Sequence, residues 1–188
     1  MNTSCIAAGR ILAAYYLHIK DYESASEISR ASIESLRTLQ DDIGIKLVVT
    51  ETALMATLAS SLVHYQAPKH HPQARELFQT ILSRKPDSVE ALVGMARVSL
   101  EAGDISDAEQ YTARALEINS LHVEAKMEHA WALVLSHDIK TGKRELEETL
   151  PLIDDRDSHS RDTIAEIWWR IGKCHWDEGT ISQFDLLM

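Results

Sequence analysis

The sequence predicts an all-α fold in which antiparallel helix pairs follow one another, and three observations lead to this prediction. One pattern of small and apolar residues recurs at a spacing of 34, with copies at 89–122 and 123 to about 151. The seven glycines and four prolines lie mostly at expected turns, whereas Ala, Leu, Glu and Ser fill the stretches between them. No stretch shows a competing strand pattern. A chain with such a period is a solenoid, whose repeats pack mainly against their neighbours.

Two series of mostly small residues give the register of the repeats. Both series run in steps of 49, 34 and 34 residues, and the first continues with a step of 42. The first series lies in the first helices and the second lies early in the second helices: Ala13, Leu62, Ala96, Ala130 and Gly172, then Ala25, Ala74, Ala108 and Gly142. We therefore expect a single solenoid domain over 1–188, with approximate copies at 6–40, 45–88, 89–122 and 123–153 and an incomplete copy at 165–188.

The longer steps indicate where the chain departs from a regular array. Residues 38–44 predict a turn with helix-capping acids, and 45–65 predict one helix of about six turns. The segment 66–72 (QAPKHHP) is an expected loop, and Pro86 ends the second copy because proline cannot continue a helix. The polar segment 154–162 is an expected linker. Only nine residues follow Gly179, so we expect the last copy to lack a full second helix and the chain to be cut there.

Composition narrows the function classes. The net charge of −10, from 29 acidic and 19 basic residues, opposes direct binding to a phosphate backbone. No run of 18 apolar residues and no charged-then-apolar leader occurs, so we expect neither membrane insertion nor secretion. Cys5 and Cys174 lie in the first and last copies, too far apart for a disulfide in a solenoid, which suits a reducing compartment. We expect a cytoplasmic protein, with the nucleus as a second location.

The residues that could carry chemistry have simpler explanations. His70 and His71 adjoin, but a structural metal site needs four ligands and none lies at a familiar spacing, so a solvated loop is expected. The side chains of Cys174 and His175 point about 100° apart on a helix, so they do not face one another as a nucleophile and its base would. We expect His175 to pack in the core. Acidic clusters such as 145–148 predict a solvated face. We predict no catalytic residue, no metal, no cofactor and no enzyme activity.

The tryptophans are the main candidates for contact with another protein. Trp168 shares a helix face with Gly172 and His175, and the register assigns this face to packing against the second helix of the last copy. Trp169 and Trp176 form a second face, on which tryptophans would be strong contact anchors. The alternative is that they pack against neighbouring helix pairs. Trp131 in the fourth copy is a similar but weaker candidate, and Arg97 is a cation on a first helix. The candidate protein-contact residues are therefore Arg97, Trp131, Trp169 and Trp176.

The copy containing Leu92, Ala96, Gly103, Ala108 and Tyr111 resembles the tetratricopeptide repeat. The resemblance implies a right-handed α-solenoid with a groove lined by first helices, which receives a peptide or helix of a partner. A carboxylate clamp for chaperone termini would need basic or amide residues at set positions. Those positions hold Arg10, Ala14, Ser60, Glu90 and Gly94, of which only Arg10 fits.

A second resemblance rests on 91–117 and on AEIWWRIGKCHWD at 165–177. Together these segments resemble the large tetratricopeptide scaffold subunit of the superkiller complex. The resemblance implies a non-catalytic scaffold that binds an RNA helicase and β-propeller partners and supports exosome-linked 3′-to-5′ decay of cytoplasmic mRNA, with no direct nucleic-acid or membrane contact. The alternative is a module that binds a short linear motif of a partner in its groove.

Overall fold

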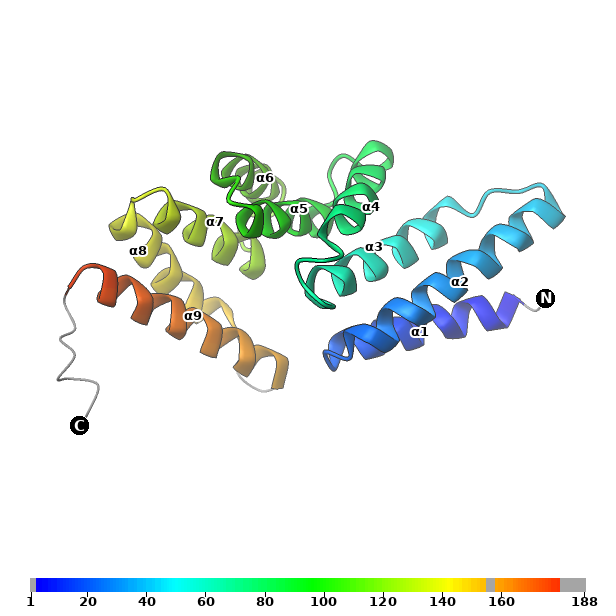
Figure 1. The fold of residues 1–188 in the computed structure, drawn as a ribbon, viewed down its shortest axis with the longest axis horizontal. Coiled ribbons are helices and arrows are strands. Elements are labelled where there is room, and N and C mark those ends of the chain that lie inside the picture. Colours follow the sequence, from blue (N-terminus) through cyan, green and yellow to red (C-terminus); the bar gives the residue numbers. More distant parts are fainter. Residues whose placement is uncertain (1–2, 155–157, 180–188) are drawn as a thin grey trace. The chain divides into compact units, whose positions relative to one another are not determined.

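The computed structural model describes residues 3–154 and 158–179, and it confirms the all-α fold class. In this part of the chain every regular element is a helix (Figure 1). The elements are α1 (Thr3–His18), α2 (Tyr22–Ile43), α3 (Val48–His64), α4 (His71–Arg84), α5 (Val89–Ala102), α6 (Ile105–Ile118), α7 (Val123–Leu135), α8 (Ile139–Thr149), the 3-10 helix η1 (Leu150–Leu152) and α9 (Ser158–Asp177). None of the described helices is both long and apolar enough to cross a membrane.

The helices fall into two compact units, and the first spans Met1–Glu101 with α1 to α5. Here α2 packs on α1 and on α3, and α3 packs on α4. The residues that set the register in these helices are fully buried: Ala13, Ala25, Leu62 and Ala74. Helices α4 and α5 approach so closely that a Cβ added at Gly94 would overlap the Phe78 ring. The small residues therefore mark close helix contacts.

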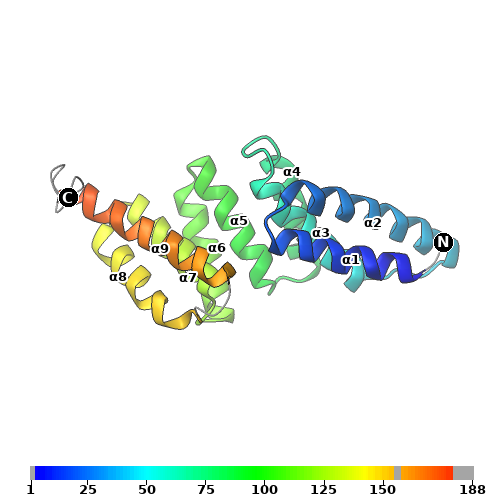
Figure 2. The same cartoon turned by 90° about the horizontal axis from the view of Figure 1, so that it is seen from below.

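The second unit, Ala102–Met188, contains α6 to α9. Helix α7 packs on α6 and on α8, and α8 packs on α9, which Figure 2 shows running beside it. A Cβ at Gly142 on α8 would lie 2.5 Å from the Ala130 carbonyl oxygen on α7, which brings the two register positions of the fourth copy into contact. The core between these helices consists of Met127, Ala130, Leu146, Ile167 and Ile171.

Helix ends follow local capping chemistry. The Asp21 carboxylate accepts a hydrogen bond from the Ser24 amide at 3.1 Å at the start of α2. The Asp138 carboxylate accepts one from the Thr141 amide at 3.3 Å at the start of α8. Helix α2 ends at Gly44, whose φ of 67° is left-handed and suits glycine. The predicted turn at 38–44 is therefore wrong, because α2 continues to Ile43 and only Gly44–Leu47 separate it from α3.

The two other expected connections are shorter than predicted. Helix α4 begins at His71 and accommodates Pro72 in its first turn, where an amide hydrogen is not needed, so the loop 66–72 loses its last two residues to a helix. Helix α9 begins at Ser158, so the predicted linker 154–162 is wrong in its second half. Residues 155–157 and the residues after Gly179, including the expected incomplete helix, lie outside the described residues.

Candidate protein-interaction surfaces

Two tryptophans from different helices meet on the second unit. The ring centroids of Trp131 on α7 and Trp169 on α9 lie 5.9 Å apart with an interplanar angle of 46°. Trp131 is half-buried, whereas Trp169 is 64% exposed. We call this pair the Trp131–Trp169 surface. The sequence register suggested both residues singly, and the structure brings them together.

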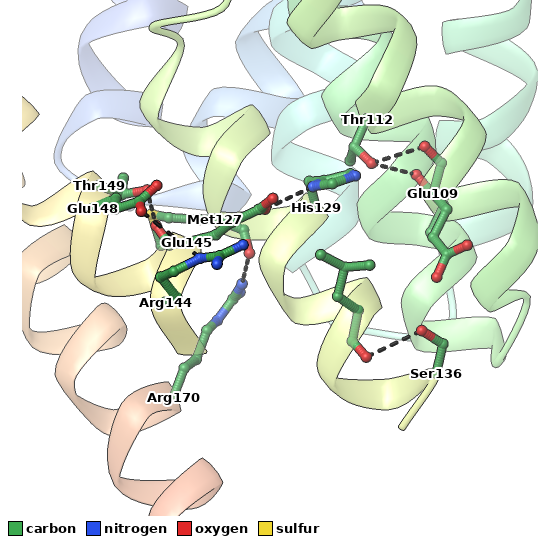
Figure 3. A network of polar contacts seen from close by, with 12 residues as sticks. Glu109, Thr112, Met127, His129, Ser136, Arg144, Glu145, Glu148, Thr149 and Arg170 are labelled. Atoms are coloured by element: carbon green, nitrogen blue, oxygen red, sulfur yellow. Dashed lines mark hydrogen bonds and ion pairs between the residues drawn. The ribbon is translucent and has the colours of Figure 1, made fainter. Parts of the chain in front are cut away.

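A buried arginine fixes the position of this surface. Arg170 Nη1 donates to the Met127 carbonyl oxygen at 2.9 Å (Figure 3), and Nη2 donates to both Glu128 carboxylate oxygens at 3.3 Å. The same Nη2 donates to Glu166 Oε1 at 2.6 Å. The Arg170 and Glu128 side chains are 8% and 2% exposed, so both charges are taken out of water and compensate one another.

The Arg170 guanidinium also lies 5.4 Å from the centroid of the Trp131 ring. At this distance a cation interacts favourably with the electron-rich face of an indole. The Arg170 side chain therefore connects α9 to α7 through both an ion pair and an aromatic contact.

The inward face of α9 differs from the face that the register suggested. Its buried side chains are Ile167, Arg170, Ile171 and Cys174, which recur every three or four residues as one helix face requires. His175 is half-buried, and its neighbour Cys174 occupies the core beside α8. The core packing predicted for His175 involves the second helix of the last copy, which lies outside the described residues, so it stays a prediction.

Trp168 and Gly172 form part of the face that was assigned to a second helix in the last copy. Trp168 is 57% exposed, and no atom of another described element lies within 4 Å of the position of a Cβ at Gly172. The residues that would form that second helix follow Gly179, outside the described residues. The packing predicted for this face therefore stays a prediction.

Trp176 lies two helical turns after Trp169, and it is 44% exposed. Trp169 and Trp176 thus present indole surface to solvent within the described part of the second unit. Their role as contacts, and that of Trp131, remains a prediction from their position.

An ion pair joins α8 to the residue after α9. Lys143 Nζ lies 2.8 Å from Glu178 Oε2, and this hydrogen bond raises the pKa of Lys143 and lowers the pKa of Glu178. Burial raises the pKa of the nearby Cys174 thiol, and the Glu178 charge raises it further. The thiol is therefore less ready to ionise than an exposed one, which opposes a nucleophilic role.

The fourth candidate contact residue, Arg97, belongs to the first unit. Its Nη1 lies 3.2 Å from His64 Nε2 at the end of α3, and the His64 ring stacks on Tyr22 with centroids 4.7 Å apart. Arg97 is half-buried. The structure places it in a polar contact between α5 and α3, and its role in binding another protein stays a prediction.

The two adjacent histidines are not both solvated, so the expected loop environment is wrong for one of them. His71 is buried, with Nε2 at 3.0 Å from the Val63 carbonyl oxygen and 3.8 Å from Glu101. His70 stacks on Tyr65. Among the described residues no three His, Cys, Asp or Glu side chains converge as metal ligands would.

A second surface in the first unit was missed by sequence reasoning. An apolar groove of about 500 Å³ runs between α3 and the end of α4, lined by Val48, Val49, Ala53, Ala56, Ile81 and Arg84 among others. Val49 is 85% exposed, and Ile45, shortly before it in the chain, is 60% exposed. The signal was present in the mostly apolar residues 45–49, which were assigned to the predicted helix 45–65.

Comparison with known proteins supports the repeat architecture. The tetratricopeptide repeat family matches residues 66–127. A thermophilic tetratricopeptide-repeat protein of Thermus thermophilus superimposes with a TM-score of 0.67, covering 89% of this chain and 84% of that one at 12% identity. MamA superimposes with a TM-score of 0.59, covering 95% of this chain and 85% of that one at 11% identity. These structures establish the fold, a solenoid of helical repeats.

Sequence similarity extends to one curated kind of protein. Superkiller protein 3 of Schizosaccharomyces pombe is 30% identical over 161 residues, and Superkiller protein 3 of Saccharomyces cerevisiae is 27% identical over 170 residues. The matches cover 86% and 90% of this chain but only 11% and 12% of the relatives, so the chain spans about a tenth of their length. The repeats and this similarity support a protein-interaction scaffold and point away from catalysis.

Proposed function

Because the chain is a tetratricopeptide-repeat protein similar to a segment of Superkiller protein 3, we propose that it is part of a non-catalytic scaffold in a superkiller-type complex. In this role it contacts an RNA helicase and a β-propeller subunit in the cytoplasm and supports exosome-linked 3′-to-5′ decay of mRNA. The proposal treats 1–188 as one solenoid built of the five approximate copies.

The observation that carries the scaffold proposal is the Trp131–Trp169 surface. Large aromatic side chains dominate the energetics of protein contacts, and here two indoles lie side by side on α7 and α9. A buried ion pair connects the two helices next to Trp131. An aromatic pair that reaches the surface favours docking of a protein over chemistry on a small substrate.

The net charge of the chain supports a role in an RNA-decay complex in which the chain itself does not contact RNA. A net charge of −10 repels phosphate backbones, so handling of RNA would belong to the partners.

A second candidate function is recognition of a short linear motif, and the apolar groove beside α3 favours it. The groove is lined mainly by apolar side chains, with Arg84, Lys85 and Glu90 beside them, as expected for a site that takes an apolar segment of a peptide. In this alternative the contacts are confined to a few residues, either those that line this groove or first-helix residues such as Arg97, which lies outside it.

Peptide competition separates the two functions. A scaffold interface is extended, so a short synthetic peptide copied from a captured partner should not displace that partner, and Arg97→Ala should leave capture unchanged. Displacement by the peptide together with loss of capture in Arg97→Ala would favour motif recognition instead. Arg84→Ala serves as a second probe, because it alters the lining of the apolar groove without changing α5.

A further inference from the structure

The negative charge of the chain is concentrated in its second unit. Residues from 102 onward include 18 acidic and 9 basic residues, whereas residues before it include 11 and 10. The first unit is thus almost neutral, and the second carries nearly all of the net charge. A partner that docks on the second unit meets a strongly negative field, which favours a positively charged partner and raises its rate of association.

Acidic groups also lie at the Trp131–Trp169 surface. Arg170 is paired with two carboxylates, those of Glu128 and Glu166. The Glu166 side chain is 45% exposed and lies one helical turn before Trp169 on α9. An acidic group therefore lies on the helix face that presents the exposed indole.

The surface already contains an example of the contact that a cationic partner would make. The Arg170 guanidinium is placed against the ring of Trp131, and the neighbouring Trp169 ring is the more exposed of the two. An indole face next to a carboxylate is the arrangement that binds ammonium and guanidinium groups, because the ring quadrupole and the anion attract the same charge.

We propose that the Trp131–Trp169 surface is a docking site for an arginine- or lysine-bearing segment of a partner protein. The basic side chain stacks on Trp169 beside Glu166, and apolar neighbours of the segment cover the rest of the indole pair. This inference rests on the proposed scaffold function and adds to it the chemistry of the docked segment.

Fluorine NMR of the protein labelled with 5-fluorotryptophan tests the proposal, because the four tryptophans give separate signals that Trp→Phe variants assign. The probes are three short peptides that are matched in apolar content and carry arginine, glutamine or glutamate. The arginine peptide should shift the Trp169 and Trp131 signals at millimolar concentration, and the shift should shrink with added salt. Its affinity should exceed that of the glutamine peptide about tenfold, the effect of one well-desolvated cation–π contact.

Variants on the same helix provide the controls. Trp169→Ala and Glu166→Gln should weaken the arginine peptide, whereas Trp168→Ala, which removes a comparably exposed indole from another face of α9, should not. Glu148→Gln on α8 is the matched charge control, since that side chain is 62% exposed and remote in sequence from the indoles.

Equal binding of the arginine and glutamine peptides, or no shift with the arginine peptide, would overturn the cationic docking site. Co-purification of protein partners by the full protein reads out the scaffold function separately. If partners co-purify but the arginine peptide binds no better than the glutamine peptide, the cationic docking site alone is contradicted. If no partners co-purify, the scaffold function itself is contradicted.

Discussion

Arg170 on α9 and Glu128 on α7 form an ion pair at 3.3 Å whose side chains are 8% and 2% exposed. Two charges taken out of water are tolerated because each compensates the other and because Met127 and Glu166 accept further guanidinium hydrogens. The pair is the main polar connection described between α7 and α9, and it lies directly beneath the Trp131–Trp169 surface.

Removal of Arg170 alone should strongly destabilise the second unit. Arg170→Met removes the guanidinium that pairs with the buried Glu128 carboxylate, and breaking a buried ion pair from one side costs about 3 to 5 kcal/mol. Chemical denaturation followed by circular dichroism measures the loss. The double variant Arg170→Met with Glu128→Leu should recover most of it, because apolar side chains then replace both members of the buried pair. A double variant no more stable than the single one would contradict this account.

The contact between Gly94 and Phe78 gives a test of helix packing in the first unit. Gly94→Ala places a methyl group against the Phe78 ring and should cost about 1 to 3 kcal/mol, as for an overpacked core. Gly172→Ala is the matched control, since no atom of another described element lies near its added Cβ and alanine is favoured over glycine within a helix by about 0.5 to 1 kcal/mol. Equal changes in melting temperature for the two variants would be inconsistent with the close approach of α4 and α5.

The Lys143–Glu178 pair should make stability depend on pH at both extremes. The pKa of Glu178 is lowered from its ordinary value of 4.5, so its contribution is present above that pH and disappears as the pH falls through the folded-state pKa. The pKa of Lys143 is raised from 10.5, so its contribution is present below that pH and is lost as the pH rises through the folded-state value.

Lys143→Met should therefore lower the melting temperature at neutral pH, and the difference from the unmodified protein should fade in strong acid. Arg144→Met is the control, because the Arg144–Glu148 pair is longer, at 3.8 Å, and both of its side chains are more than half exposed. A difference for Lys143→Met that is the same at acidic and neutral pH would show that the ion pair is not its cause.

The two cysteines should differ sharply toward a thiol reagent. Cys5 is exposed, whereas Cys174 is buried and its thiol pKa is raised. One thiol per chain should react rapidly with Ellman's reagent in the folded protein, and both should react in denaturant. The variant Cys5→Ser should remove the rapid phase; a rapid phase that persists in it would place Cys174 at the surface and contradict the orientation of α9.

The spacing of small residues predicted much of the packing, because small residues recur where helices approach most closely. Ala130 and Gly142 were placed as a pair by register alone, and the structure brings them into contact. Helix ends were less predictable: the acids Asp41 and Asp42 resemble turn residues, yet α2 continues through them to Ile43, and the Gly44 amide caps it by donating to the Gln40 carbonyl oxygen.

The Trp131–Trp169 surface could be predicted only in part. The two residues are 38 positions apart, so their contact depends on how α7 and α9 pack, which no local pattern contains. Burial of Arg170 was also hidden, because a charged residue after two tryptophans is expected at the surface. It becomes buried only because Glu128 and the Met127 carbonyl oxygen are placed by another helix.

The scaffold account is tested most directly by affinity purification of the tagged protein from its native cells, with and without RNase, followed by identification of the proteins that co-purify. The account predicts that a helicase and a β-propeller protein are recovered in both samples and that Trp131→Ala with Trp169→Ala reduces their recovery. Recovery that disappears with RNase, or a recovery limited to one short-motif protein, would contradict the scaffold.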